Sequence, residues 1–169
     1  PITALTVFRE ELFIFAEERI YKLAGNTVAD FVLQPVTREI GCKNGFTVQE
    51  FAGDIVFLGP DGLRSVAATE RIGDVELGTI SLPVQERFEG IINPDEFDSL
   101  VIPDKTQYRI FFNNRSERTQ AQTKGIICVR KGDSYEFSET KGIQPSCTDY
   151  LISSGVTYVL HGGYDGYAY

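Results

Sequence analysis

The 169-residue chain contains no methionine, no tryptophan, a single histidine and three cysteines. Its apolar runs are short, as at Ile55 to Leu58, whereas a membrane-spanning helix needs roughly 18 apolar residues. The first residues, Pro1 to Leu5, lack the basic start and the apolar core of a secretory signal. We therefore expect no membrane insertion.

The missing methionine and the strand-like pattern at the C-terminus, around Gly162 to Tyr169, favour a segment of a longer protein. Removal of an initiator methionine before Pro1 is the alternative explanation of the N-terminus. On either reading, the mean hydropathy of −0.12 is that of an ordinary globular domain.

Basic residues are also scarce. Lys and Arg number 16 against 24 Asp and Glu, which gives a net charge of −8 and a pI of about 4.7. A protein that binds nucleic acid by neutralising phosphates needs a basic patch, and this composition argues against one. We expect DNA to pass such a surface without specific binding.

The cysteines are Cys42, Cys128 and Cys147, an odd number with no CxxC spacing. They fit neither a disulfide framework nor a zinc site, so we expect three buried free thiols. No Asp-x-Asp-x-Asp run suggests calcium, and no Gly-Lys-Thr/Ser loop suggests a bound phosphate. We expect no metal and no cofactor.

Candidate catalytic residues are equally few. The only histidine, His161, lies where a strand pattern enters Gly162-Gly163, so we expect a packed or hydrogen-bonded strand-end residue. The carboxylates concentrate in predicted turns, where Asp bonds its own backbone. A polysaccharide hydrolase, which needs two carboxylates in one cleft, is the weakest alternative. We therefore predict no catalytic residues and no enzyme.

The dominant pattern is the alternation of apolar and polar residues in short runs bounded by Gly, Pro, Asp and Asn, which predicts β-strands. Helix is the rival reading of the first 23 residues, but Phe13-Ile14-Phe15 favours strand. The predicted strands are 4–8, 12–16, 19–23, 46–51, 55–58, 63–67, 98–102, 107–112, 125–130, 134–138, 149–152 and 156–160. A polar, exposed loop is predicted over 113–124, and one short helix over 83–91.

Four strand patterns overlay on one another, starting at Glu11, Asp54, Gln107 and Gly155, at intervals of about 43, 53 and 48 residues. This period matches a four-stranded propeller blade of about 40–50 residues. A β-sandwich is the alternative. We predict an all-β, partial β-propeller formed by one segment with blade-like units at 1–45, 46–97, 98–148 and 149–169.

Three blocks carry a family resemblance: Glu39 to Phe46 followed by Asp54 to Val66, then Arg71 to Ser81, and finally Gly162 to Tyr167. They resemble tailed-phage virion structural proteins, specifically the tail tubular or nozzle-type proteins with a propeller fold. The resemblance covers most of positions 5–112 and the C-terminal hairpin.

The resemblance implies a structural component of a phage tail, located in the virion, that takes part in DNA ejection. It implies a ring of copies, hexameric in the family, around the DNA channel, with neighbouring tail proteins and fibres as partners. It carries no catalytic residues. The alternative function is a carbohydrate- or receptor-binding module that uses Tyr164, Tyr167 and Tyr169 as its interaction residues.

Overall fold

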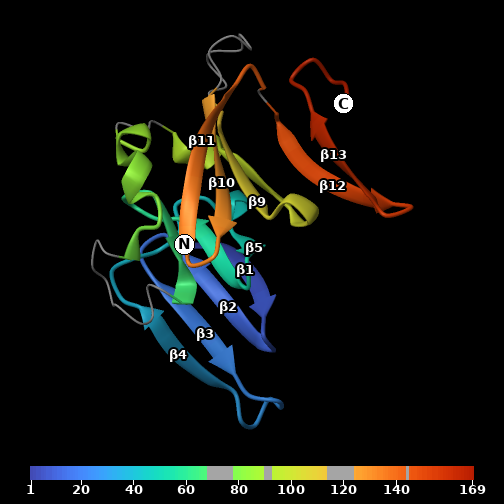
Figure 1. Cartoon of the computed structure of the whole chain (residues 1–169). Coiled ribbons are helices and arrows are strands. Elements are labelled where there is room, and N and C mark those ends of the chain that lie inside the picture. Colours follow the sequence, from blue (N-terminus) through green and yellow to red (C-terminus); the bar gives the residue numbers. More distant parts are fainter. Residues whose placement is uncertain (68–77, 90–92, 114–123, 144) are drawn as a thin grey trace. The chain divides into compact units, whose positions relative to one another are not determined.

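A computed structural model describes the chain except for residues 68–77, 90–92, 114–123 and 144. The chain divides into two compact units, Pro1–Ile91 and Ile92–Tyr169. Strands make up 54% of the described residues and helical turns 12%, and the sheets are antiparallel (Figure 1). The predicted all-β class is confirmed.

The first unit contains two antiparallel sheets in which the strands follow one another in chain order. Sheet A has the order β1-β2-β3-β4 and sheet B the order β5-β6-β7. The bounds are β1 Ile2–Phe8, β2 Glu11–Ala16, β3 Ile20–Ala24, β4 Val32–Thr37, β5 Gln49–Phe51, β6 Asp54–Leu58 and β7 Leu63–Ser65. Among the described residues of this unit, the 3₁₀ helices are η1 Gly45–Thr47 and η3 Leu82–Arg87.

The second unit contains sheet C, with the order β11-β10-β9-β8, and a two-stranded C-terminal hairpin, β12-β13. The bounds are η4 Pro94–Glu96, β8 Asp98–Ile102, η5 Pro103–Lys105, β9 Gln107–Phe112, β10 Lys124–Lys131, β11 Ser134–Lys141, β12 Cys147–Ser153 and β13 Val156–Gly162. Sheets A and C are both four-stranded meanders.

Tight turns with positive φ connect several hairpins, because their backbone twist matches that of the flanking strands. Gly53, Gly132 and Gly155 adopt this conformation without a Cβ penalty. The β1–β2 turn instead uses Arg9 and Glu10, at φ 49° and 66°. Arg9 offsets part of that cost, because its guanidinium donates to the Gly53 carbonyl at 2.8 Å.

The core of the first unit lies between sheets A and B. Phe15 and Phe57, one from each sheet, are fully buried with ring centroids 5.5 Å apart. The segment between β4 and β5 joins both sheets, since the Cys42 amide donates to Ala16 O at 2.8 Å and the Lys43 amide donates to Leu58 O at 3.0 Å. A Cβ on Gly41 would collide with the backbone at Ala16 to Glu18. This position requires glycine because two backbones cross there.

A buried ion pair closes the β6–β7 turn. Arg64, only 3% exposed, donates to Asp61 through Nε at 2.7 Å and through Nη2 at 2.6 Å. The Thr79 hydroxyl donates to the same carboxylate at 2.6 Å, and the Gln85 amide donates to the Asp61 carbonyl. Burial alone would raise the pKa of Asp61, but the bonds from Arg64 and Thr79 outweigh it and lower the pKa. We call these four residues the Asp61 clasp.

The core of the second unit is formed mainly by β9 and β10. Tyr108, Ile110, Ile126 and Cys128 are at most 1% exposed, and the register places Ile110 opposite Ile126 and Tyr108 opposite Cys128. Burial raises the pKa of the Cys128 thiol to about 12, which keeps the sulfur protonated and chemically inert.

Thr148 ties the C-terminal hairpin to sheet C within the second unit. The Thr148 hydroxyl on β12 donates to Asp98 Oδ2 on β8 at 2.7 Å. Burial raises the pKa of Asp98, and the Thr148 bond opposes that rise only in part.

Several predictions need correction. The predicted strand 46–51 begins as the 3₁₀ helix η1, because Asn44 Oδ1 accepts from the Phe46 amide and caps it. The strand β4 was not predicted. Cys147 is exposed rather than buried, since it lies at the start of the uncovered hairpin, whereas Cys42 and Cys128 are buried as expected.

The helix predicted over 83–91 is present as the shorter 3₁₀ helix η3, with Pro83 in its first turn. Val84 has non-helical dihedrals, φ −127° and ψ 26°, so no continuous α-helix forms there. Asn113, at the start of the loop predicted to be exposed, is only 1% exposed because its amide donates to Pro145 O at 2.6 Å. The rest of that predicted loop lies almost entirely outside the described residues, as does Ile91 at the end of the predicted helix.

The four sheets can be compared with the predicted units at 1–45, 46–97, 98–148 and 149–169. Sheets A, B and C lie inside the first three. The hairpin begins at Cys147, two residues before the fourth. The blade interpretation of these units stays a prediction.

Candidate functional site

The three candidate tyrosines lie in the C-terminal segment that follows β13. Tyr167 is 70% exposed and Tyr169 is 55% exposed, whereas Tyr164 is half-buried. The segment folds back on β13, because the His161 amide donates to Tyr169 O at 3.0 Å and the Tyr169 amide donates to His161 O at 2.9 Å. The tyrosines therefore belong to one short loop, but they do not form a single platform.

Tyr169 already has two partners. Its ring stacks on His161 with centroids 5.1 Å apart and an interplanar angle of 19°. Its hydroxyl donates to Asp165 Oδ2 at 2.5 Å, which lowers the pKa of Asp165 and raises the pKa of Tyr169. Of the three tyrosines, Tyr167 has the ring most open to a ligand. The contacts also agree with the expected role of His161 as a packed strand-end residue.

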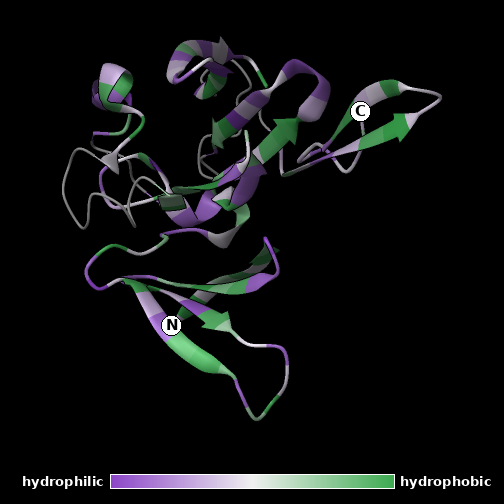
Figure 2. Ribbon diagram, turned by 60° about the horizontal axis from the view of Figure 1, so that its bottom comes forward, coloured by the Kyte–Doolittle hydropathy of each residue, from purple (hydrophilic) through white to green (hydrophobic). Residues whose placement is uncertain are grey.

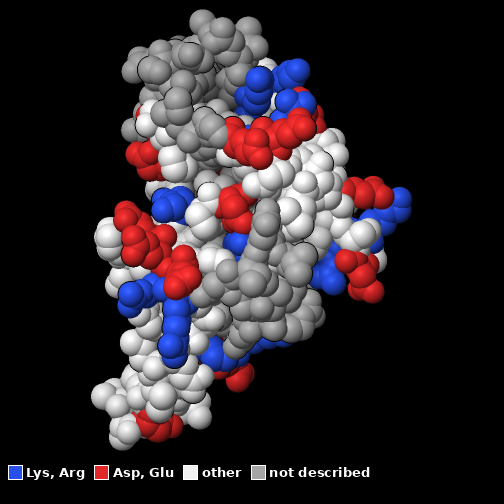
Figure 3. Space-filling view, turned by 90° about the vertical axis from the view of Figure 1, so that its left-hand side faces the viewer, with Lys and Arg blue, Asp and Glu red and all other residues white. Residues whose placement is uncertain are grey.

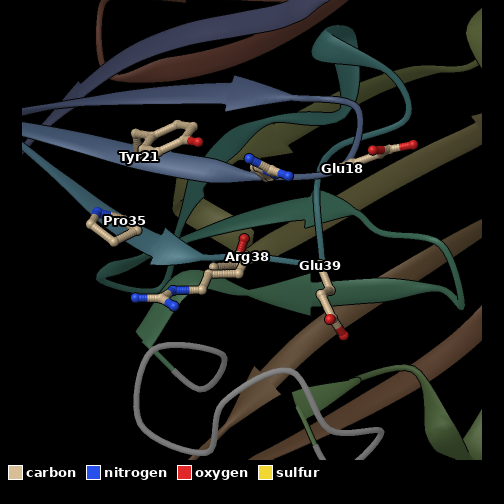
Figure 4. Close-up of a pocket in the computed structure, with 7 residues that line it drawn as sticks. Glu18, Tyr21, Pro35, Arg38 and Glu39 are labelled. Atoms are coloured by element: carbon tan, nitrogen blue, oxygen red, sulfur yellow. The ribbon is translucent and has the colours of Figure 1, made fainter.

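A groove of about 740 Å³ lies beside sheet A. It is lined by Glu18, Arg19, Tyr21, Pro35, Thr37, Arg38 and Glu39. Tyr21 comes from β3 and Pro35 from β4, while the charged residues come from the ends and turns of these strands (Figure 4). The groove thus combines two cations, two anions and one aromatic ring.

The groove holds two carboxylates, which is the feature that the hydrolase alternative requires. Both Glu18 and Glu39 are exposed, and in Figure 4 their carboxylates point away from Tyr21 and Pro35. Arg19 is one of the two cations, and hydrogen bonding and electrostatic attraction from Tyr21 raise its pKa. The arrangement suits surface recognition of a mixed-charge partner.

A second candidate is the face of sheet A that points away from sheet B. Leu5 is 62% exposed, Val7 is 69% exposed and Leu33 is 55% exposed. The register aligns two apolar rows across all four strands, Val7-Leu12-Leu23-Leu33 and Leu5-Ile14-Tyr21-Pro35. We call these eight residues the outer face of sheet A. Tyr21 and Pro35 belong to both the groove and this face, so the groove adjoins it.

Sequence reasoning missed this face, although a signal was present. Leu12-Phe13-Ile14-Phe15 is a run of four apolar residues in one strand, so both faces of β2 are apolar. Such a run is typical of a strand covered on both sides. Phe13 and Phe15 are buried, whereas Leu12 and Ile14 are half-buried on the outer face, where Leu5, Val7 and Leu33 are more than half exposed.

Charged groups do not gather by sign on the surface that Figure 3 presents, where acidic and basic side chains are interspersed. Among the described residues, no group of three His, Cys, Asp or Glu side chains could hold a metal ion. In the same part of the chain, no helix is long and apolar enough to cross a membrane.

No protein-family model and no curated protein matches the chain. Its function is therefore inferred from its own residues.

Proposed function

We propose that the chain is an arc of a β-propeller and serves as a structural component of a bacteriophage tail. In this role it forms part of a ring around the DNA channel and contacts neighbouring tail proteins. The tail assignment comes from the resemblance of the blocks at 39–46, 54–66, 71–81 and 162–167. The propeller assignment has separate support from the sheets.

One observation carries the propeller proposal, which is that sheet A is apolar on both faces. Its inner face packs on sheet B through Phe13, Phe15 and Ile20. Its outer face is also apolar, and Leu5, Val7 and Leu33 on it are more than half exposed. A blade within a propeller is packed between two neighbours, so both of its faces must be apolar, whereas an end sheet of a two-layer sandwich needs only one.

Strand order gives additional support. A propeller blade is a four-stranded antiparallel sheet, and sheets A and C are both meanders of four strands in chain order. A sandwich with Greek-key connections would pair strands that are not consecutive in the chain.

The acidic composition suits a protein that DNA must pass. A net charge of −8 removes the phosphate attraction that would retard DNA in a channel. A strongly positive channel wall in the assembled ring would contradict this part of the proposal.

The structural role can be tested in a phage that encodes this chain. We expect Leu5→Asp/Val7→Asp, which charges the outer face, to leave the isolated chain folded and to prevent tail assembly. The control is Ser134→Asp/Ser138→Asp, which adds the same charge at two exposed polar positions. Electron microscopy of particles that lack tails only in the first variant would support the proposal. Normal tails in both variants would refute it.

A receptor-binding module is the second candidate, favoured by the 70% exposure of Tyr167. A glycan array that detects a ligand for the chain, with loss of binding in Tyr167→Ala, would support it. The Tyr167→Ala variant should not change folding, because its ring is open to solvent.

A further inference from the structure

The edge strands of the sheets differ in how they are protected against pairing with another chain. Natural proteins protect edges with charges, proline, bulges or short strands. Here β1 has a bulge near its start, β4 contains a proline, β5 and β7 have three residues each, and β11 carries Glu136, Glu139 and Lys141. The strand β13, Val156–Gly162, has seven residues and contains no Pro, Asp, Glu, Lys or Arg.

The hairpin geometry fixes which backbone groups of β13 point outward. Ser154 and Gly155 form a two-residue turn at φ 51° and 76°, so Ser153 and Val156 are a hydrogen-bonded pair. The backbone N–H and C=O groups of successive residues point alternately toward β12 and away from it. Those of Thr157, Val159 and His161 therefore point away from β12. The backbone hydrogen bonds between His161 and Tyr169 agree with this assignment, because they use the outward groups of His161.

The C-terminal segment therefore covers only one end of the edge. Tyr169 satisfies the outward amide and carbonyl of His161. The outward amides and carbonyls of Thr157 and Val159 meet no partner in the described part of the chain. An edge of five residues, from Val156 to Leu160, is open.

We propose that this edge pairs with the same edge of a second copy of the chain, which converts two hairpins into one four-stranded antiparallel sheet. One register satisfies all four outward groups. It places Thr157 opposite the second copy's Val159, and Tyr158 opposite the second copy's Tyr158. A shift by two residues would place an outward group opposite either His161, which Tyr169 already occupies, or Gly155, which belongs to the turn.

The side chains fit this pairing as well. Opposed residues share a face, so Val156 would lie beside the second copy's Leu160 on the face that carries both Tyr158 rings. These side chains are exposed in the single chain, where the hairpin is apolar along its strands (Figure 2). An isolated two-stranded hairpin is marginally stable in water, and strand addition removes that weakness. No side chain of β13 itself carries a charge that would oppose the contact between two copies.

The first test measures the mass of the intact chain in solution by light scattering. We expect a dimer for the wild type and a monomer for Val159→Pro, because proline removes the outward amide without breaking a bond to β12. Val159→Thr is the matched control, since it keeps both the amide and the β-branched shape and should remain dimeric. Circular dichroism checks that all three chains are folded.

The second test reads the register by disulfide crosslinking under a mild oxidant, with the exposed Cys147 replaced by Ser. Residues at a non-hydrogen-bonded antiparallel position have Cα atoms about 4.5 Å apart, which a disulfide can bridge. Tyr158→Cys should therefore crosslink with its own copy. Val156→Cys should not, because the two copies of residue 156 would lie about 14 Å apart along the strand.

A monomeric wild type at 100 μM overturns the inference, as does a dimer that Val159→Pro leaves intact. Equal crosslinking of Tyr158→Cys and Val156→Cys overturns the register. Stable capture of an unrelated β-strand peptide by a monomeric chain assigns the edge to a different occupant and also overturns the inference. None of these results bears on the outer face of sheet A, so the proposal for the phage tail is tested separately.

Discussion

Removing the Asp61 carboxylate should destabilise the first unit more than any other single loss of charge among the described ion pairs. The Asp61→Ala variant leaves the Arg64 guanidinium, which is 3% exposed, without its bidentate partner. Removing one partner of a buried ion pair costs about 3–5 kcal/mol. The Asp61 side chain itself is 29% exposed, so water can reach the vacated space and we expect the lower end, about 3 kcal/mol.

The variant can be compared with one that removes both charges. Asp61→Ala/Arg64→Met should recover most of the loss, because no unpaired charge stays buried. The matched surface control is Asp133→Ala, which breaks the Arg130–Asp133 contact at 4.0 Å with a fully exposed carboxylate. A pair of that kind contributes at most about 1 kcal/mol.

Urea unfolding followed by circular dichroism measures each free energy of unfolding. The pKa of Asp61 is lowered in the folded chain, so its contribution is present above the unfolded pKa and is lost as pH falls through the folded one. The difference between wild type and Asp61→Ala should therefore shrink in acid. Equal costs for Asp61→Ala and Asp133→Ala at neutral pH would refute the reasoning.

For four further substitutions, the structure predicts whether stability rises or falls. Burial raises the pKa of Asp98, so the folded chain holds the carboxyl proton more tightly than the unfolded chain and loses stability as pH rises through that pKa. The Asp98→Asn variant can still accept a hydrogen bond from Thr148 and should remove this loss of stability. Urea unfolding at a series of pH values measures the difference. Ala52→Gly at φ 54° should stabilise by about 1 kcal/mol, and the neighbouring Gly53→Ala at φ 79° should destabilise by a similar amount in the same assay. Gly41→Ala should cost about 2–3 kcal/mol through collision with backbone, and a thermal midpoint unchanged from wild type would contradict the close approach.

Alternation of apolar and polar residues was enough to find most strands. The predictions 98–102 and 107–112 match β8 and β9 residue for residue. Strand β4 was not predicted because Pro35 interrupts the alternation of apolar and polar residues, and within a sheet proline is compatible with an edge strand only. The strand predicted from Phe46 did not take account of Asn44, a residue type favoured at the start of helices, which caps η1 there.

The candidate site was harder to predict from the sequence than the strands were. Exposure of Tyr167 and Tyr169 follows from their place in a Gly-rich segment, but the stacking of Tyr169 on His161 depends on how that segment turns back. The outer face of sheet A depends on the register that aligns Leu12 with Leu23 and Ile14 with Tyr21. Such long-range alignment is set by tertiary packing, which composition and periodicity do not specify.

The outer face of sheet A also makes the behaviour of the chain depend on ionic strength. Two opposing effects act between copies, since the apolar rows favour contact while the net charge of −8 keeps molecules apart. Salt weakens only the second effect, because the distance over which charges repel falls from about 30 Å at 0.01 M to about 10 Å at 0.1 M. We therefore expect contact between copies through this face to be weaker in dilute buffer than at physiological salt.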